Sequence, residues 1–124
     1  MDRNPLDIVG ELLMVRVRDK SIEDWERILD GRMKGQTAEK VRQELAGTGS
    51  EVPAAVNRMV PRVVDTVLHH LLWTLEQEQA INLSIEADGT VTPSIREVSD
   101  GLSGELYGER GWIVKFSQKK SMEA

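Results

Sequence analysis

Apolar residues recur at the spacing of amphipathic helices along the first third of the chain. A stripe of large aliphatic side chains predicts a helix from Asn4, which has the chemistry of a helix cap, to about Arg18. A second helix is expected to begin at Ser21, because "SIED" resembles a capping box, and to end at Gly31 or Gly35. The two stretches are therefore expected to form separate helices.

Two more helices are predicted before residue 80. The run "TAEKVRQELAG" predicts a short helix with Thr37 as its cap and Gly47 as its stop. A long helix is expected from about Pro53 to Gln79. Pro61 lies inside this helix, where its ring removes a backbone hydrogen bond, so we expect it to kink or split the helix.

After residue 80 the apolar period changes from helical to alternating. The runs at 81–87 and 90–98 predict two strands, and the Asp-Gly pair at 88–89 between them predicts a tight turn. The run "GWIVKFS" at 111–117 alternates in the same way and predicts a third strand. Together these runs predict a small antiparallel sheet of three strands.

The expected fold class is α+β, since a run of helices precedes a run of strands. A single domain is expected over 1–124, with a bundle of about four helices over 4–79 and the sheet over 80–117. Residues 118–124 are expected to form a disordered tail.

The glycine-rich stretch "SDGLSGELYGERGW" lies just before the predicted third strand. It lacks the Gly-Lys-Ser/Thr ending of a phosphate-binding loop, and its acids would repel an anion. It also departs from a nucleophile elbow, because Glu105 stands where the last glycine would follow Ser103. Two structures remain open for residues 100–108, a short helix or one arm of a hairpin.

Composition narrows the class of protein further. The 124 residues include no cysteine, which excludes disulfides, thiolate metal sites and thiol nucleophiles. No apolar run is long enough to cross a bilayer, and the start does not resemble a secretory signal, so a cytoplasmic protein with no membrane association is expected.

Charge is unevenly distributed along the chain. The formal net charge is −5, and residues 65–110 hold nine acids against two arginines, a net of −7. Because affinity for nucleic acids depends largely on neutralising phosphates, we expect no nucleic-acid partner. An acidic half attracts a basic protein, although solubility is the simpler explanation of the charge.

The long predicted helix has two contrasting faces. At about 100° per residue, its apolar residues are expected to gather on the buried face: Val60, Val64, Val67, Leu71 and Leu75. The opposite face gathers Asp65, His69, Trp73 and Glu76, which are the candidate partner-binding residues. An exposed tryptophan is typical of a binding anchor, and the alternative is that Trp73 packs in the core against Trp112 or Phe116.

The same face offers a metal hypothesis. Asp65 and His69 are four residues apart, so they are neighbours on a helix surface, and Glu76 follows further along. A carboxylate and an imidazole at this spacing are able to share a metal ion or form an acid–base pair. The simpler interpretation is an ordinary Asp–His pair on a solvated surface.

The C-terminal run "LHHLLWTLEQEQAINL…SDGLSGELYGERGWIVKFS" resembles small bacterial proteins of a family of unknown function. The resemblance covers the second half of the chain and implies no activity. In general make-up the chain is also similar to immunity proteins, which neutralise secreted bacterial toxins and are small, acidic and free of cysteine. This second likeness is compositional and implies no functional residues.

The leading hypothesis is therefore a non-enzymatic binding protein, similar in make-up to immunity proteins, that presents its acidic half to a basic protein partner. No catalytic residue and no cofactor are assigned. One alternative is a small metal-binding domain or metal-dependent enzyme that uses His69 with Asp65 or Glu76. Another is a structural homo-oligomer whose apolar helices pair across a two-fold axis.

Overall fold

The computed structural model describes residues 3–119, and its first part is one uninterrupted helical rod. Helix α1 (Pro5–Leu13) continues through a π-helical turn (Met14–Arg18) into helix α2 (Asp19–Leu29). The side chain of Asn4 caps α1 as predicted, accepting a 2.9 Å hydrogen bond from the backbone N–H of Leu6. The prediction of a second cap at Ser21 is wrong, because this residue lies inside the rod.

A turn then leads into helices α3 (Gln36–Leu45) and α4 (Glu51–Gln77). Gly31 and Gly47 follow α2 and α3 in the left-handed conformation, which confirms both as helix stops. Gly35 rather than Thr37 stands at the start of α3. Helix α4 runs unbroken through Pro61, so the expected split does not occur.

Only two strands form in the described part of the chain. Strands β1 (Ile85–Ala87) and β2 (Thr90–Thr92) pair antiparallel, with Glu86 opposite Val91. Asp88 and Gly89 both have positive φ, 55° and 76°, which confirms the predicted tight turn between them. The sheet is therefore a short hairpin and covers much less than residues 80–117.

The predicted third strand is wrong, because "WIVKF" forms the short helix α5 (Trp112–Phe116). Over five residues, Trp112 and Phe116 share a face at strand spacing and at helical spacing alike, so the pattern does not decide between them. Packing decides in favour of the helix. Trp112 is buried, and a Cβ on Gly10 of α1 would overlap its indole ring, so the two segments are in close contact.

Two 3₁₀ turns connect the hairpin to α5, at Ile95–Val98 and Ser103–Leu106. The second turn settles the question left open for residues 100–108, which form neither a regular α-helix nor a strand. The fold is thus α+β with four helices before a two-stranded hairpin.

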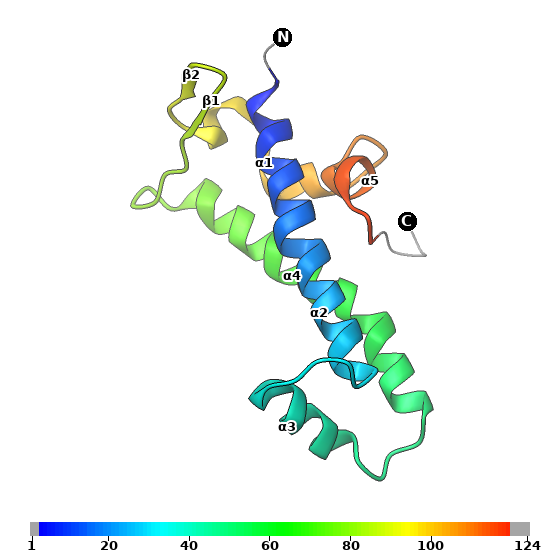
Figure 1. Ribbon diagram of the computed structural model, residues 1–124. Coiled ribbons are helices and arrows are strands. Elements are labelled where there is room, and N and C mark those ends of the chain that lie inside the picture. Colours follow the sequence, from blue (N-terminus) through cyan, green and yellow to red (C-terminus); the bar gives the residue numbers. More distant parts are fainter. Residues whose placement is uncertain (1–2, 120–124) are drawn as a thin grey trace.

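The α1–α2 rod and α4 lie side by side and form the long axis of the molecule (Figure 1). Helix α3 lies at the end where α2 and α4 connect, and the hairpin, the 3₁₀ turns and α5 gather toward the other end. Between them lies the principal core, made of buried residues of the rod, α4, the segment of the 3₁₀ turns and α5: Val9, Met14, Leu68, Leu72, Ile95, Leu102, Leu106 and Trp112. Among residues 3–119, no helix is long and apolar enough to span a membrane.

The buried face of α4 differs from the predicted one. Val60, Leu68 and Leu72 are buried, whereas Val67 and Leu71, predicted to be buried, are exposed. The observed core face is therefore rotated around the helix toward Asp65 and Glu76. This rotation follows from the packing of the C-terminal turns against α4, which the residue pattern of α4 does not reveal.

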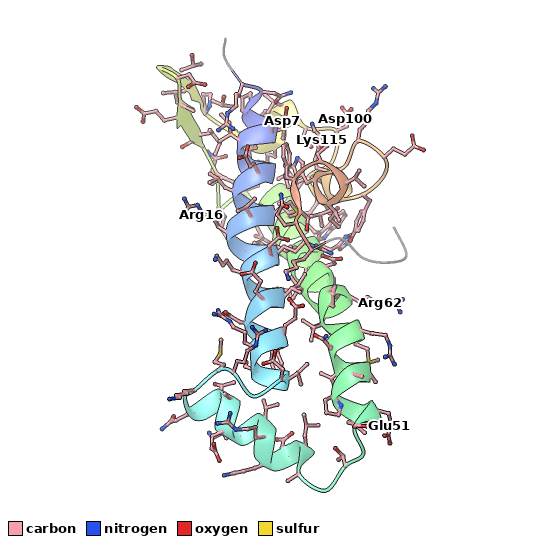
Figure 2. The ribbon with its side chains drawn as sticks, turned by 45° about the vertical axis from the view of Figure 1, so that its right-hand side comes forward. Asp7, Arg16, Glu51, Arg62, Asp100 and Lys115 are labelled. Carbon is pink, nitrogen blue, oxygen red and sulfur yellow. The ribbon has the colours of Figure 1, made fainter. Side chains whose placement is uncertain are left out.

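The C-terminal segment is attached to the helical rod at both ends of α5. Lys115 Nζ lies 2.8 Å from Asp7 Oδ1 of α1, and Figure 2 shows the two side chains next to each other. Gln118 and Lys119, predicted to begin a disordered tail, instead form hydrogen bonds with Asp19 and Ser117. The rest of that predicted tail, residues 120–124, lies outside the described residues.

Candidate functional site

Three aromatic side chains lie along one side of α4. His69 and Trp73 lie one helical turn apart, and the turn after Leu106 brings Tyr107 to His69, with Tyr107 Oη 3.3 Å from His69 Nδ1. Trp73 and Tyr107 are each 49% exposed, and His69 is half-buried. We call His69, Trp73 and Tyr107 the aromatic patch.

The glycine-rich stretch positions Tyr107. Leu102 and Leu106 are completely buried against the core, which fixes the 3₁₀ turn on α4. After Tyr107 the chain reverses through Gly108, which has a φ of 89°, and a Cβ on Gly111 would overlap the Tyr107 carbonyl. The glycines therefore serve a tight chain reversal that presents Tyr107 at the surface.

Glu76 has a structural role in the same region. Its Oε1 accepts a hydrogen bond from the backbone N–H of Leu102, at the start of the 3₁₀ turn. A carboxylate at such a donor satisfies a backbone group that would otherwise be unpaired near the core. Glu76, predicted to bind a partner, is half-buried and holds the turn that carries Tyr107.

Asp65 is also engaged within the fold. Arg18 Nε lies 2.6 Å from Asp65 Oδ1, and Arg18 Nη2 lies 3.2 Å from Asp65 Oδ2. The guanidinium is completely buried, and the carboxylate is largely buried. This pair was missed by sequence reasoning, because 47 residues separate its members and no local pattern connects them.

The Arg18 guanidinium extends into a buried polar network. Its Nη1 donates to Ser117 Oγ at 2.8 Å, and Ser117 Oγ donates to Asp19 Oδ1 at 2.6 Å. Asp19 Oδ2 accepts from the backbone N–H of Gln118, and Arg18 Nη1 also donates to the Lys119 carbonyl. Three segments of the chain are thus joined around one buried cation, which is how a buried charge is tolerated.

The π-helical turn places Arg18 and Asp19 in this network. The backbone N–H of Asp19 bonds to the Met14 carbonyl, a five-residue step that widens the helix by one residue. Both Arg18 and Asp19 face inward as a result, beside the buried Met14. Turns of this type are frequent at functional sites, but here the side chains that it presents are committed to internal partners.

The three candidate metal ligands do not converge. Asp65 pairs with Arg18, His69 lies against Tyr107, and Glu76 binds the Leu102 N–H. Within residues 3–119, no group of three histidine, aspartate or glutamate side chains is arranged to hold a metal ion. The geometry therefore gives the metal hypothesis no support.

Burial raises the pKa of Tyr107 above its ordinary value, and the nearby carboxylate of Asp65 raises it further. The phenol therefore stays neutral at physiological pH. It is suited to donating a hydrogen bond or to packing against a ligand, and it is poorly suited to acting as a nucleophile.

Small cavities lie away from the aromatic patch. One of about 140 Å³ lies between the start of α1 and the hairpin and is lined by Pro5, Ile8 and Thr90 among others. Another, of about 260 Å³, is lined by charged side chains including Glu26 and Lys119. Both are smaller than the roughly 300–1,000 Å³ of typical small-molecule pockets.

Of the acids at 65–110, several face solvent. Asp65, Glu76 and Glu105 have internal partners. Asp88 accepts a hydrogen bond from the backbone N–H of Arg3. The side chains of five others are exposed and form no hydrogen bond or ion pair with another described residue: Glu78, Glu86, Glu97, Asp100 and Glu109. Arg96 lies in the same region, where its Nη1 donates to three carbonyls at and just beyond the end of α4.

The fold and this surface describe a small helical α+β domain with an exposed aromatic patch in an acidic half. No protein-family model, curated protein or solved structure matches the chain.

Proposed function

We propose that the protein is a non-enzymatic binding module that takes a basic protein partner on the aromatic patch. The observation that carries this proposal is the exposure of Trp73. Its indole is half in solvent, in a chain with only five phenylalanine, tryptophan and tyrosine residues, while Trp112 is buried. Tryptophan and tyrosine are enriched among the residues that dominate protein interfaces.

Charge supports a basic partner. The five exposed acids belong to the elements around and beyond the C-terminal end of α4, and Glu109 follows Tyr107 by two residues. A lysine or arginine of the partner would face the indole and the phenol, which favours cation–π contact, while the acids steer its approach. A secreted basic toxin is the kind of partner that the compositional likeness to immunity proteins implies.

The roles of the four predicted partner-binding residues are divided in this proposal. Trp73 and His69 contact the partner together with Tyr107. Asp65 and Glu76 hold the underlying structure through Arg18 and the Leu102 N–H. Substituting Glu76 would therefore reduce binding indirectly, by loosening the segment that carries Tyr107.

The experiment is capture of partners from a bacterial lysate by the wild-type protein and by Trp73→Ala. The proposal expects a basic protein to be captured at low salt, to weaken at high salt and to be lost with Trp73→Ala. Val91→Ala is a matched control, because Val91 is a similarly exposed apolar residue on β2. Equal capture by the wild type and Trp73→Ala would refute the proposal.

A further inference from the structure

A second exposed feature of α4 is a ridge of four large apolar side chains. Met59, Val63, Val67 and Leu71 follow one another at four-residue spacing, so they stack along the helix. Their exposed fractions are 60%, 60%, 63% and 44%. A helix of a soluble protein ordinarily buries its apolar stripe, and α4 has a second one outside the core.

The face of α4 that carries this ridge has no formal charge. At about 100° per residue, the α4 residues within roughly 60° of its centre are uncharged, with Val56, His70 and Thr74 among them. Arg62 lies on a neighbouring face, and Figure 2 shows it projecting from the side of α4. Depletion of charged residues is the mark of the core of a protein interface.

We propose that this ridge is an interface in which α4 of a second copy of the chain packs in the antiparallel sense. Two antiparallel helices that cross at a shallow angle of about 20°, as in four-helix bundles, keep such ridges in contact over several turns. A two-fold axis at residue 65 places Met59 opposite Leu71 of the second copy and Val63 opposite Val67. The same surface of each copy then meets itself, as in most homodimers.

The distribution of charge favours a second copy of the chain on the ridge, and it favours antiparallel packing of the two α4 helices. A basic partner gains no electrostatic attraction from an uncharged face, and two copies with a net charge of −5 repel each other least there. In the antiparallel arrangement, residues 65–110 of the two copies, each with a net charge of −7, lie toward opposite ends of the paired helices. A parallel arrangement would bring the two acidic segments together.

Packing points to the same occupant. Helices α2 and α4 contact each other, and the buried side chains of α4, Val60, Leu68 and Leu72, lie on a face next to the ridge, with Val60 at its border. A second copy would turn this two-helix layer into a bundle of four long helices, an arrangement in which each helix buries more of its apolar surface.

The first test is the mass in solution by light scattering after size exclusion. The wild type is expected at about twice the 13.9 kDa of one chain. Val63→Glu would place a charge at the centre of the interface, and the dimer dissociation constant is expected to rise at least about a hundredfold. Val98→Glu, at an exposed valine outside α4, is the control and is expected to remain dimeric.

Circular dichroism and thermal unfolding show whether Val63→Glu is folded. Because Val63 is largely exposed within one chain, the monomeric variant is expected to retain its helical content. A wild-type protein that is monomeric at every concentration, or a folded Val63→Glu that is as dimeric as the wild type, would overturn the proposal.

The second test determines direction by cross-linking, since the chain has no cysteine of its own. Met59→Cys and Leu71→Cys are expected to form a disulfide with each other when mixed. Neither is expected to cross-link alone, because in the antiparallel arrangement identical positions are about 18 Å apart, too far for a disulfide. Cross-linking of each variant alone, with none in the mixture, would show a parallel pair and contradict the proposal.

These tests distinguish the proposed dimer from the proposed binding of a basic partner, because either proposal can be refuted without the other. Trp73 lies about 100° around α4 from the centre of the ridge, so it stays outside the proposed dimer interface. A folded, monomeric Val63→Glu that still captures the basic partner would separate the two surfaces. A dimer with no captured partner would support this inference and count against the proposed function.

Discussion

The guanidinium of Arg18 forms a bidentate ion pair with the carboxylate of Asp65, with Nε 2.6 Å from Oδ1 and Nη2 3.2 Å from Oδ2. The arginine is completely buried, so it depends on this carboxylate and on Asp19 for its neutralisation. Asp65→Ala would leave the cation without its closest partner. We expect the free energy of unfolding to fall by about 3–5 kcal/mol, measured by urea denaturation.

The double variant Arg18→Met, Asp65→Leu is the control for that prediction. It removes both charges and fills similar volume, so its loss of stability is expected to be clearly smaller than that of Asp65→Ala alone. A single variant that is as stable as the wild type would show that the buried pair contributes nothing.

Gly10 allows α1 to contact the indole of Trp112. A Cβ at this position would overlap the ring, although alanine is intrinsically better than glycine in a helix by about 1 kcal/mol. Gly10→Ala is therefore expected to lower the free energy of unfolding by about 1–3 kcal/mol, because the helix must separate from α5. Urea denaturation measures this change.

Gly104 offers a matched comparison. No atom lies within 4 Å of a Cβ built there, and its φ is not positive. Gly104→Ala is expected to change stability by no more than about 0.5 kcal/mol. If both substitutions had the same effect, close packing at Gly10 would not be the cause.

Arg96 closes the C-terminal end of α4. Its Nη1 lies 2.8–2.9 Å from the carbonyl oxygens of Leu75 in the last turn, of the cap residue Glu78 and of Ile81 just beyond the helix. Carbonyls at the end of a helix accept no hydrogen bond from a following helical turn, so they need other donors. Arg96→Ala is expected to cost about 1–3 kcal/mol of stability. Hydrogen exchange would show faster opening at the end of α4 while its middle stays protected; uniform protection along α4 would contradict this role.

Tyr107 is the only tyrosine, so the phenolate absorbance of the folded protein reports on it alone. The midpoint of its titration is expected above the ordinary pKa of 10.0 in the folded protein. Unfolding in urea removes the burial and is expected to lower the midpoint. Because the pKa is raised by folding, this group stabilises the fold fully below about pH 10 and loses that contribution as the pH rises toward the folded pKa. A midpoint at or below 10.0 in the folded state would be inconsistent with the described burial.

Sequence reasoning predicted the features that depend on local chemistry. The Asn4 cap, the left-handed glycines after α2 and α3, and the Asp88-Gly89 turn are confirmed because each is specified by one or two residues. The alternation of "WIVKF" was misleading, since a five-residue run fits either period. The contact between Gly10 and Trp112, about 100 residues apart, selected the helix.

The candidate site was predictable only in part. The exposed position of Trp73 was one of two interpretations, and the usual burial of tryptophan favoured the other, a position in the core. Tyr107 and Arg18 were missed, because each reaches its partner across long sequence separations, 38 residues to His69 and 47 to Asp65. The sequence alone indicates surface acids at Asp65 and Glu76, because their partners, Arg18 and the backbone N–H of Leu102, lie far away along the chain.

The most direct measurement of the central claim is the affinity of the captured basic partner for Trp73→Ala and for Val91→Ala. The account predicts that Trp73→Ala raises the dissociation constant by about thirtyfold or more, the effect of losing an interface anchor worth about 2 kcal/mol. Val91→Ala is expected to bind as the wild type does. A Trp73→Ala protein that binds the partner with wild-type affinity would contradict the claim that the aromatic patch is the binding surface.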